Sequence, residues 1–201
     1  MRKLAAVLLL LPSISCAPSG PAPIPRAYLF EKGPYQALYG PDGRIMRLLY
    51  DRNQDRVADV VTLFYPSGQP RQIEIDSNLD GMVERWESYD VQRRLVKVAS
   101  SRRSPGRPDL WEYFNSSGRV QKREVDENGD DRPDRIELFA EGQLVRVEID
   151  GDAEGRMDRW QEWRSGRLWA EALDTDGDGE PDRRLRFGPN GDVIGMERLG
   201  R

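Results

Sequence analysis

Four aspartates lie close together in the stretch DTDGDGEPDR, which begins at Asp174. Asp174, Asp176 and Asp178 occupy alternate positions, and Asp182 follows. Carboxylates crowded in this way repel one another unless they are solvated or a cation lies between them. A hard divalent cation takes six to eight oxygens at roughly 2.3–2.6 Å, and alternate residues of a tight turn supply them. The stretch therefore predicts a metal site with these four carboxylates and the carbonyl of Glu180 as ligands.

Four further stretches place oxygen-bearing side chains at the same first, third, fifth and ninth positions. Their predicted ligands are Asp76, Asn78, Asp80 and Glu84; Asp126, Asn128, Asp130 and Asp134; Asp150, Asp152, Glu154 and Asp158; and Asp51, Asn53, Asp55 and Asp59. We name each stretch by its first residue, as the 51, 76, 126, 150 and 174 loops. Glycine at the sixth position permits the sharp bend. It is present in the 76, 150 and 174 loops and replaced by Arg56 and Asp131 in the other two.

A sixth stretch, SRRSPGRPD in the 101 loop, keeps only the ninth-position carboxylate, Asp109. We predict no metal there. The persistence of Asp109 indicates that the ninth-position acid has a structural task beside the following strand. Asp, Asn and Gly are also common turn formers, so acidic turns without metal are the alternative interpretation of all the loops.

The pattern D-x-[DN]-x-D-x-x-x-[DE] resembles the start of the EF-hand calcium loop. It is equally similar to the calcium loops of thrombospondin type 3, dockerin and FG-GAP repeats. The resemblance implies Ca²⁺ as the cofactor, with side-chain oxygens at positions 1, 3, 5 and 9 and a backbone carbonyl at position 7. Mg²⁺ fits less well because it demands tighter octahedral geometry. The Glu of position 12 occurs only in some loops and no flanking helix is predicted, so the loops are EF-hand-like in a β context.

The loops mark a repeat of 24–25 residues, which is the strongest signal in the sequence. Its six units start at Asp51, Asp76, Ser101, Asp126, Asp150 and Asp174. The fourteenth position is always aromatic, at Phe64, Tyr89, Phe114, Phe139, Trp163 and Phe187. Each unit consists of an acidic loop, a stretch of β-formers, a tight turn and a second β-like stretch.

Similar hairpin-like stretches at residues 38–50 and 186–199 bracket the array, which makes seven hairpins. We predict an all-β fold of tandem β-hairpins forming a meandering antiparallel sheet or an elongated β-solenoid. A curled barrel or small propeller is the alternative. Positions 11 and 14 are an odd number apart, so either both faces of the strand are covered or a bulge lies between them.

The N-terminus, MRKLAAVLLLLPSISC, has a basic start and an apolar run at residues 4–11 that is too short to span a bilayer. Small residues then lead to Cys16. This arrangement resembles a bacterial lipoprotein signal, which implies cleavage before Cys16 and lipid on its sulfur. An ordinary secretory signal is the alternative. We expect a signal peptide at 1–15, a lipidated Cys and proline-rich tether at 16–34, and the hairpin repeat domain at 35–201.

Composition excludes several classes of protein. The chain has no His and one Cys, so it can form neither a Ser–His or Cys–His catalytic pair nor a Cys-based zinc site. Its 31 basic residues interleave with 35 acidic ones, which is not the basic footprint of a nucleic-acid binder.

We therefore expect a lipid-anchored envelope protein that faces the periplasm or exterior and serves as a structural or partner-binding module, not as an enzyme. Ala17 after the Cys resembles lipoproteins sent to the outer membrane, if the bacterium has one. The tryptophans Trp86, Trp111, Trp160, Trp163 and Trp169 could form core or a face for a protein or glycan partner. The alternatives are a calcium-dependent adhesin or sensor, and a glycan hydrolase using two carboxylates.

Overall fold

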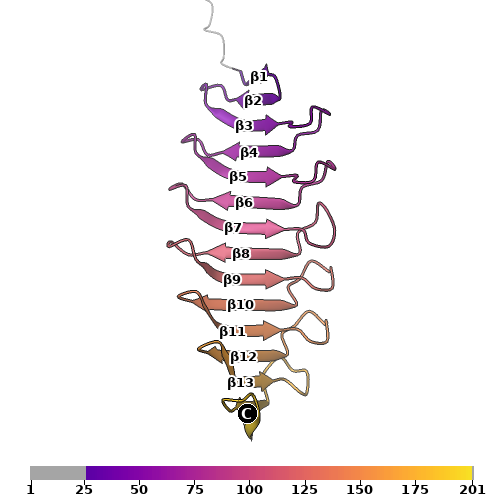
Figure 1. Cartoon of the computed structure of the whole chain (residues 1–201), viewed down its shortest axis with the longest axis vertical. Coiled ribbons are helices and arrows are strands. Elements are labelled where there is room, and N and C mark those ends of the chain that lie inside the picture. The colour runs from indigo at the N-terminus through magenta and orange to yellow at the C-terminus, as the bar shows by residue number, and fades with distance from the viewer. Residues whose placement is uncertain (1–25, 201) are drawn as a thin grey trace, which may run out of the picture.

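The computed structural model describes residues 26–200, which form one sheet of fifteen strands and no helix. The strands pair in chain order from β1 to β15, each antiparallel to the next. Figure 1 shows a long ladder with the acidic loops along one edge and the hairpin turns along the other. The predicted all-β fold and meandering sheet of hairpins are confirmed. The sheet is open, so the alternative of a closed barrel or propeller is wrong.

The strands are short and evenly spaced. They are β1 (Tyr28–Lys32), β2 (Tyr35–Tyr39), β3 (Ile45–Tyr50), β4 (Val60–Phe64), β5 (Pro70–Ile75), β6 (Arg85–Tyr89), β7 (Leu95–Ser100), β8 (Leu110–Phe114), β9 (Val120–Val125), β10 (Arg135–Ala140), β11 (Gln143–Ile149), β12 (Arg159–Arg164), β13 (Arg167–Leu173), β14 (Arg183–Phe187) and β15 (Val193–Arg198). The seven predicted hairpins run from β2–β3 to β14–β15. β1 is an additional strand, and it lies within the segment expected to belong to the tether.

A bulge interrupts every one of these hairpins at the same place. The register shifts just before the fourteenth position, for example between Leu63 and Phe64 and between Leu138 and Phe139. The extra residue lies on the second strand, as Arg71 and Val145 do. Positions 11 and 14 of the first strand are therefore not brought to one face, and both faces of the sheet carry aromatic side chains.

The register places alternate residues in rows across the sheet. On one face, which we call the tryptophan face, Trp86 pairs with Ala99 and Ala99 with Trp111. On the opposite face, Glu137 pairs with Val147 and Val147 with Gln161.

The core is a thin layer on each face of a single sheet. The most buried apolar residues are small ones flanked by larger neighbours: Ala37, Val98, Ala99, Val125, Val147 and Ala170. Val147 has no exposed surface, because the stems of Glu137 and Gln161 lie beside it. Long polar side chains can cover apolar surface in this way while their heads remain in water.

The expected signal peptide and Cys16 lie outside the described residues. Between residues 26 and 200, no helix is long and apolar enough to cross a membrane.

Candidate metal centres in the acidic loops

Five of the acidic loops share one backbone shape. Their fourth and sixth residues have positive φ; these are Gln54, Arg56, Leu79, Gly81, Gly129, Asp131, Ala153, Gly155, Gly177 and Gly179. Glycine adopts this region freely, whereas Arg56 (φ 78°) and Asp131 (φ 71°) hold it at a cost of roughly 1 kcal/mol or more. The two loops that lack glycine at position 6 therefore keep the same shape.

The first carboxylate of each of these five loops holds the bend. The position-6 N–H donates to it at 2.7–2.9 Å in all five. Asp76, Asp126 and Asp174 also accept the position-4 N–H through their second oxygen. In Asp51 and Asp150 that second oxygen, Oδ1, is buried without a hydrogen-bond partner. Each of these two carboxylates therefore has one oxygen that could still accept a hydrogen bond or bind a cation.

The ninth-position carboxylate closes each loop from its other end by accepting the N–H of position 2. This bond is present in all six loops. In the 101 loop, Arg102 N donates to Asp109 at 3.0 Å, so the expected structural task of Asp109 is confirmed. Asp59, Asp109 and Asp134 are all buried.

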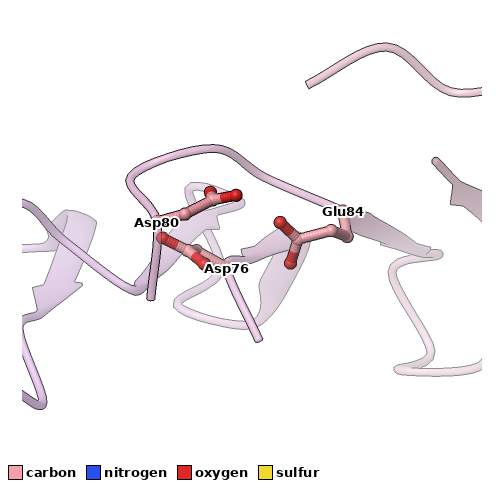
Figure 2. Close-up of side chains that lie close together, drawn as sticks. All are labelled: Asp76, Asp80 and Glu84. Carbon is pink, nitrogen blue, oxygen red and sulfur yellow. The ribbon is translucent and has the colours of Figure 1, made fainter. Parts of the chain in front are cut away.

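Carboxylates converge in three loops. The sets are Asp76, Asp80 and Glu84; Asp150, Asp152 and Asp158; and Asp174, Asp176 and Asp178. Within each set, one oxygen of each residue lies within 4.8 Å of the others, and each set could hold a metal ion. Figure 2 shows the Glu84 carboxylate directed toward Asp76 and Asp80.

Other predicted ligands make different contacts. Glu154 lies 3.7 Å from the guanidinium of Arg156. Asp182 accepts hydrogen bonds from the hydroxyl and the N–H of Thr175. In the 126 loop, Asn128 donates to both oxygens of Asp134. Among the described residues, neither the 51 nor the 126 loop brings three carboxylates within mutual reach.

The 76 and 150 loops hold carboxylate oxygens with unmet hydrogen-bonding capacity. Asp150 is 7% exposed and its Oδ1 has no hydrogen-bond partner. Asp158 Oδ1 and Glu84 Oε1 are also buried and unpartnered. A buried acceptor without a partner costs free energy, so a cation among these oxygens would remove that penalty.

The 101 loop supplies its own positive charge. Arg102 Nε lies 3.1 Å from Asp109, and Arg107 reaches the next loop, 2.6 Å from Asp131. The Arg107 guanidinium holds the pKa of the Asp131 carboxyl below its ordinary value. The sequence carried a signal for these pairs, because basic residues occupy positions 2 and 7 of the one loop that lacks the acidic pattern.

Hydrogen bonds favour the ionised form of two carboxylates of the 174 loop, Asp174 and Asp182. The N–H of Gly179, followed by that of Gly177, lowers the pKa of Asp174. The Thr175 hydroxyl lowers the pKa of Asp182. Ionised carboxylates are the form that binds a metal ion.

No family model matches this chain, and no curated protein matches it. The chain is similar to solved structures of TarM, with a TM-score of 0.38 and 15% identity over 51% of this chain and 20% of TarM. A mutant of S. aureus TarM in complex with fondaparinux, alpha-GlcNAc-glycerol and UDP has a TM-score of 0.40 and 14% identity, over 55% of this chain and 22% of the mutant. A GtfA/B complex bound to UDP and GlcNAc has a TM-score of 0.32 and 15% identity, over 65% of this chain and 25% of the matched chain.

The chain thus spans about a fifth to a quarter of the length of these proteins. Similarity at these TM-scores supports no argument about the function of this protein.

Proposed function

We propose that this chain is a lipid-anchored protein of the bacterial cell envelope whose acidic loops bind Ca²⁺ and whose sheet serves as a structural or partner-binding module. The observation that carries the calcium proposal is in the 150 loop. There, Asp150, Asp152 and Asp158 converge within 4.8 Å, and Asp150 is more than nine-tenths buried with an oxygen that has no hydrogen-bond partner.

The donor set supports calcium rather than a transition metal. Every predicted side-chain ligand is a carboxylate or amide oxygen, and the chain has no His. Hard oxygen ligands suit Ca²⁺ and Mg²⁺. An adaptable loop with backbone and water oxygens completing the shell favours Ca²⁺, which accepts six to eight ligands in irregular geometry. We assign these carboxylates to cation binding and loop structure rather than to catalysis.

Stabilisation by calcium suits an open sheet with so little core. Each loop joins one hairpin to the next, so a cation there would hold neighbouring repeats together along the side of the sheet where the strands end.

The terminal strands support a role in binding. Tyr28, Leu29 and Phe30 of β1 and Ile194 and Met196 of β15 are all more than half exposed. Among the described strands, β1 and β15 each pair on one side only, and such an edge strand can receive a strand of another chain.

Isothermal titration calorimetry of the full chain purified in detergent tests the metal proposal. We expect binding of Ca²⁺ at dissociation constants of ~10⁻⁴ to 10⁻³ M, the range of extracellular calcium modules. Mg²⁺ at equal concentration should bind more weakly. Absence of binding heat with calcium would contradict the proposal.

Membrane fractionation tests the anchor. Cys16→Ala removes the sulfur that would carry the lipid, so the variant should leave the membrane fraction or accumulate unprocessed. A Cys16→Ala protein that fractionates with membranes like the wild type would contradict the lipoprotein assignment.

A further inference from the structure

The 150 and 174 loops border one acidic cleft. We propose that they form a single two-cation site, in which an ion in one loop strengthens binding of an ion in the other. This inference rests on the proposed binding of Ca²⁺ by the individual loops, and it adds that these two loops act as a pair.

The cleft has a volume of about 430 Å³ and is lined from both sides. The 150 loop contributes Asp152, Glu154 and Asp158, and the 174 loop contributes Asp174 and Asp176. Each loop supplies at least two members of its own converging carboxylate set to the cleft. Ions bound to the two sets would therefore lie in the same open cleft.

The cleft contains a buried carboxylate oxygen that has no hydrogen-bond partner. Asp158 lines it, and the Oδ1 atom of Asp158 is buried without a hydrogen-bond partner. Asp150 completes the same carboxylate set and is 7% exposed, also with an unpartnered Oδ1. These oxygens point to a ligand independently of the number of acidic residues nearby.

The backbone connects the two sets directly. The N–H of Asp174 donates to the carbonyl oxygen of Asp158 at 2.9 Å. Asp158 is the last carboxylate of the first set and Asp174 is the first carboxylate of the second. An ion that fixes the Asp158 side chain also fixes the carbonyl that positions Asp174. Because the first ion has already ordered Asp174, the second ion does not have to pay the conformational entropy of ordering it. The second ion therefore binds more tightly.

The charge balance permits two ions. The loops at 150–158 and 174–182 carry nine carboxylates and one basic residue, Arg156, which also lines the cleft. Two divalent cations neutralise half of that net negative charge. The first ion therefore leaves the cleft negative, and attraction of the second ion offsets the repulsion between the two cations.

The 76 loop provides a matched control because neither of its neighbours, the 51 and 101 loops, has a converging set of three carboxylates among the described residues. The 101 loop is the neighbour that follows it in the chain. That loop keeps only Asp109, which is paired with Arg102. Asp80 and Asp178 both stand at position 5, and each accepts the N–H of position 7 through Oδ1. Substituting either one with Asn replaces an equivalent carboxylate ligand with an uncharged, weaker amide ligand, and Asp178 does not line the shared cleft.

The experiment follows glycine amides during calcium titration of the full chain, selectively labelled with ¹⁵N-glycine, in detergent. The N–H groups of Gly81, Gly155 and Gly179 donate to the first carboxylates of the 76, 150 and 174 loops, so each resonance reports occupancy of its own loop. In Asp178→Asn we expect Gly179 to respond weakly. The Gly155 midpoint should move to at least about five-fold higher calcium, the lower end of typical coupling between sites.

In Asp80→Asn, the Gly81 response should weaken while the Gly155 midpoint stays where it is in the wild type. A Gly155 midpoint that is unchanged in Asp178→Asn would overturn the pairing and leave calcium binding by single loops intact. An equal shift of Gly155 in both variants would also overturn it, because the effect would then be general. If no glycine responds to calcium in the wild type, the pairing and the proposed calcium binding both fail.

Discussion

Two carboxylates of the 150 loop, Asp150 and Asp158, each have two oxygens with different tasks. In the 150 loop, Oδ2 of Asp150 accepts the N–H of Gly155 at 2.7 Å, and Oδ1 is left without a partner. Asp158 shows the same arrangement. Its Oδ2 accepts the N–H of Gly151, and its Oδ1 has no hydrogen-bond partner. One oxygen thus shapes the loop, and the other can contact a cation without disturbing that shape.

Single substitutions should separate metal ligands from structural acids. Asp178→Ala removes a carboxylate from the converging set of the 174 loop, so calorimetry should show one fewer calcium ion bound. Asp109→Ala should leave the number of ions unchanged, because its loop has no other predicted ligand, while it lowers stability through loss of the hydrogen bond from Arg102. Equal stoichiometry in the two variants would show that the 174 loop holds no ion.

A tyrosine on the tryptophan face makes a pH prediction. Burial, followed by the hydrogen bond to Glu124, raises the pKa of Tyr113 to about 12. The unfolded value is about 10, so the stability that this tyrosine contributes is complete below about pH 10 and is lost as pH rises toward 12. Tyr113→Phe should reduce the amplitude of phenolate absorbance that develops near pH 12. An unchanged titration would contradict this environment.

At the scale of the element, the hairpin with its bulge is the unit of the fold. The repeat predicted the hairpins because the aromatic fourteenth position and the acidic loop recur at a fixed spacing. The bulge could not be located from sequence, because the extra residue on the second strand has no common type: it is Arg71 in one hairpin and Val145 in another. The pairing register, not the composition, decides where it falls.

The thin core on the face opposite the tryptophan face, which holds Val147, can be tested on one strand of one hairpin. Val147 has no exposed surface, whereas Val145, at the bulge of β11, is 39% exposed. Val147→Ala should lower the free energy of unfolding by about 1–3 kcal/mol through lost burial and the cavity it leaves. The control Val145→Ala should lower it by about 0.5 kcal/mol or less. Equal losses, measured by urea denaturation, would mean that this face has no core at Val147.

The loops also show how far a motif carries. The spacing of acidic residues identified three sets of carboxylates that the structure brings together. It could not show that Asn128 would occupy both oxygens of Asp134, or that Arg107 would pair with Asp131 of the next loop. Such pairings depend on which neighbouring side chains lie within reach, and a single loop sequence does not contain that information.

At the scale of the whole molecule, every strand contacts only the strands before and after it in the chain. Stability is then a sum of repeat and nearest-neighbour terms, and residues 26–200 form no second layer that could support a weak junction. The repeat made this architecture predictable. β1 was not predicted, because its residues, Tyr28–Lys32, belong to no repeat unit and directly follow the proline-rich segment.

The central claim is that cations in the acidic loops stabilise the sheet, and thermal unfolding with and without calcium tests it most directly. At ten times the dissociation constant, each occupied loop adds roughly 1.4 kcal/mol by mass action. Three loops would then raise the Tm of a chain of this size by roughly 10 °C, and a chelator should reverse the rise. A Tm that is the same in millimolar calcium and in chelator would contradict the claim and leave the loops as acidic turns.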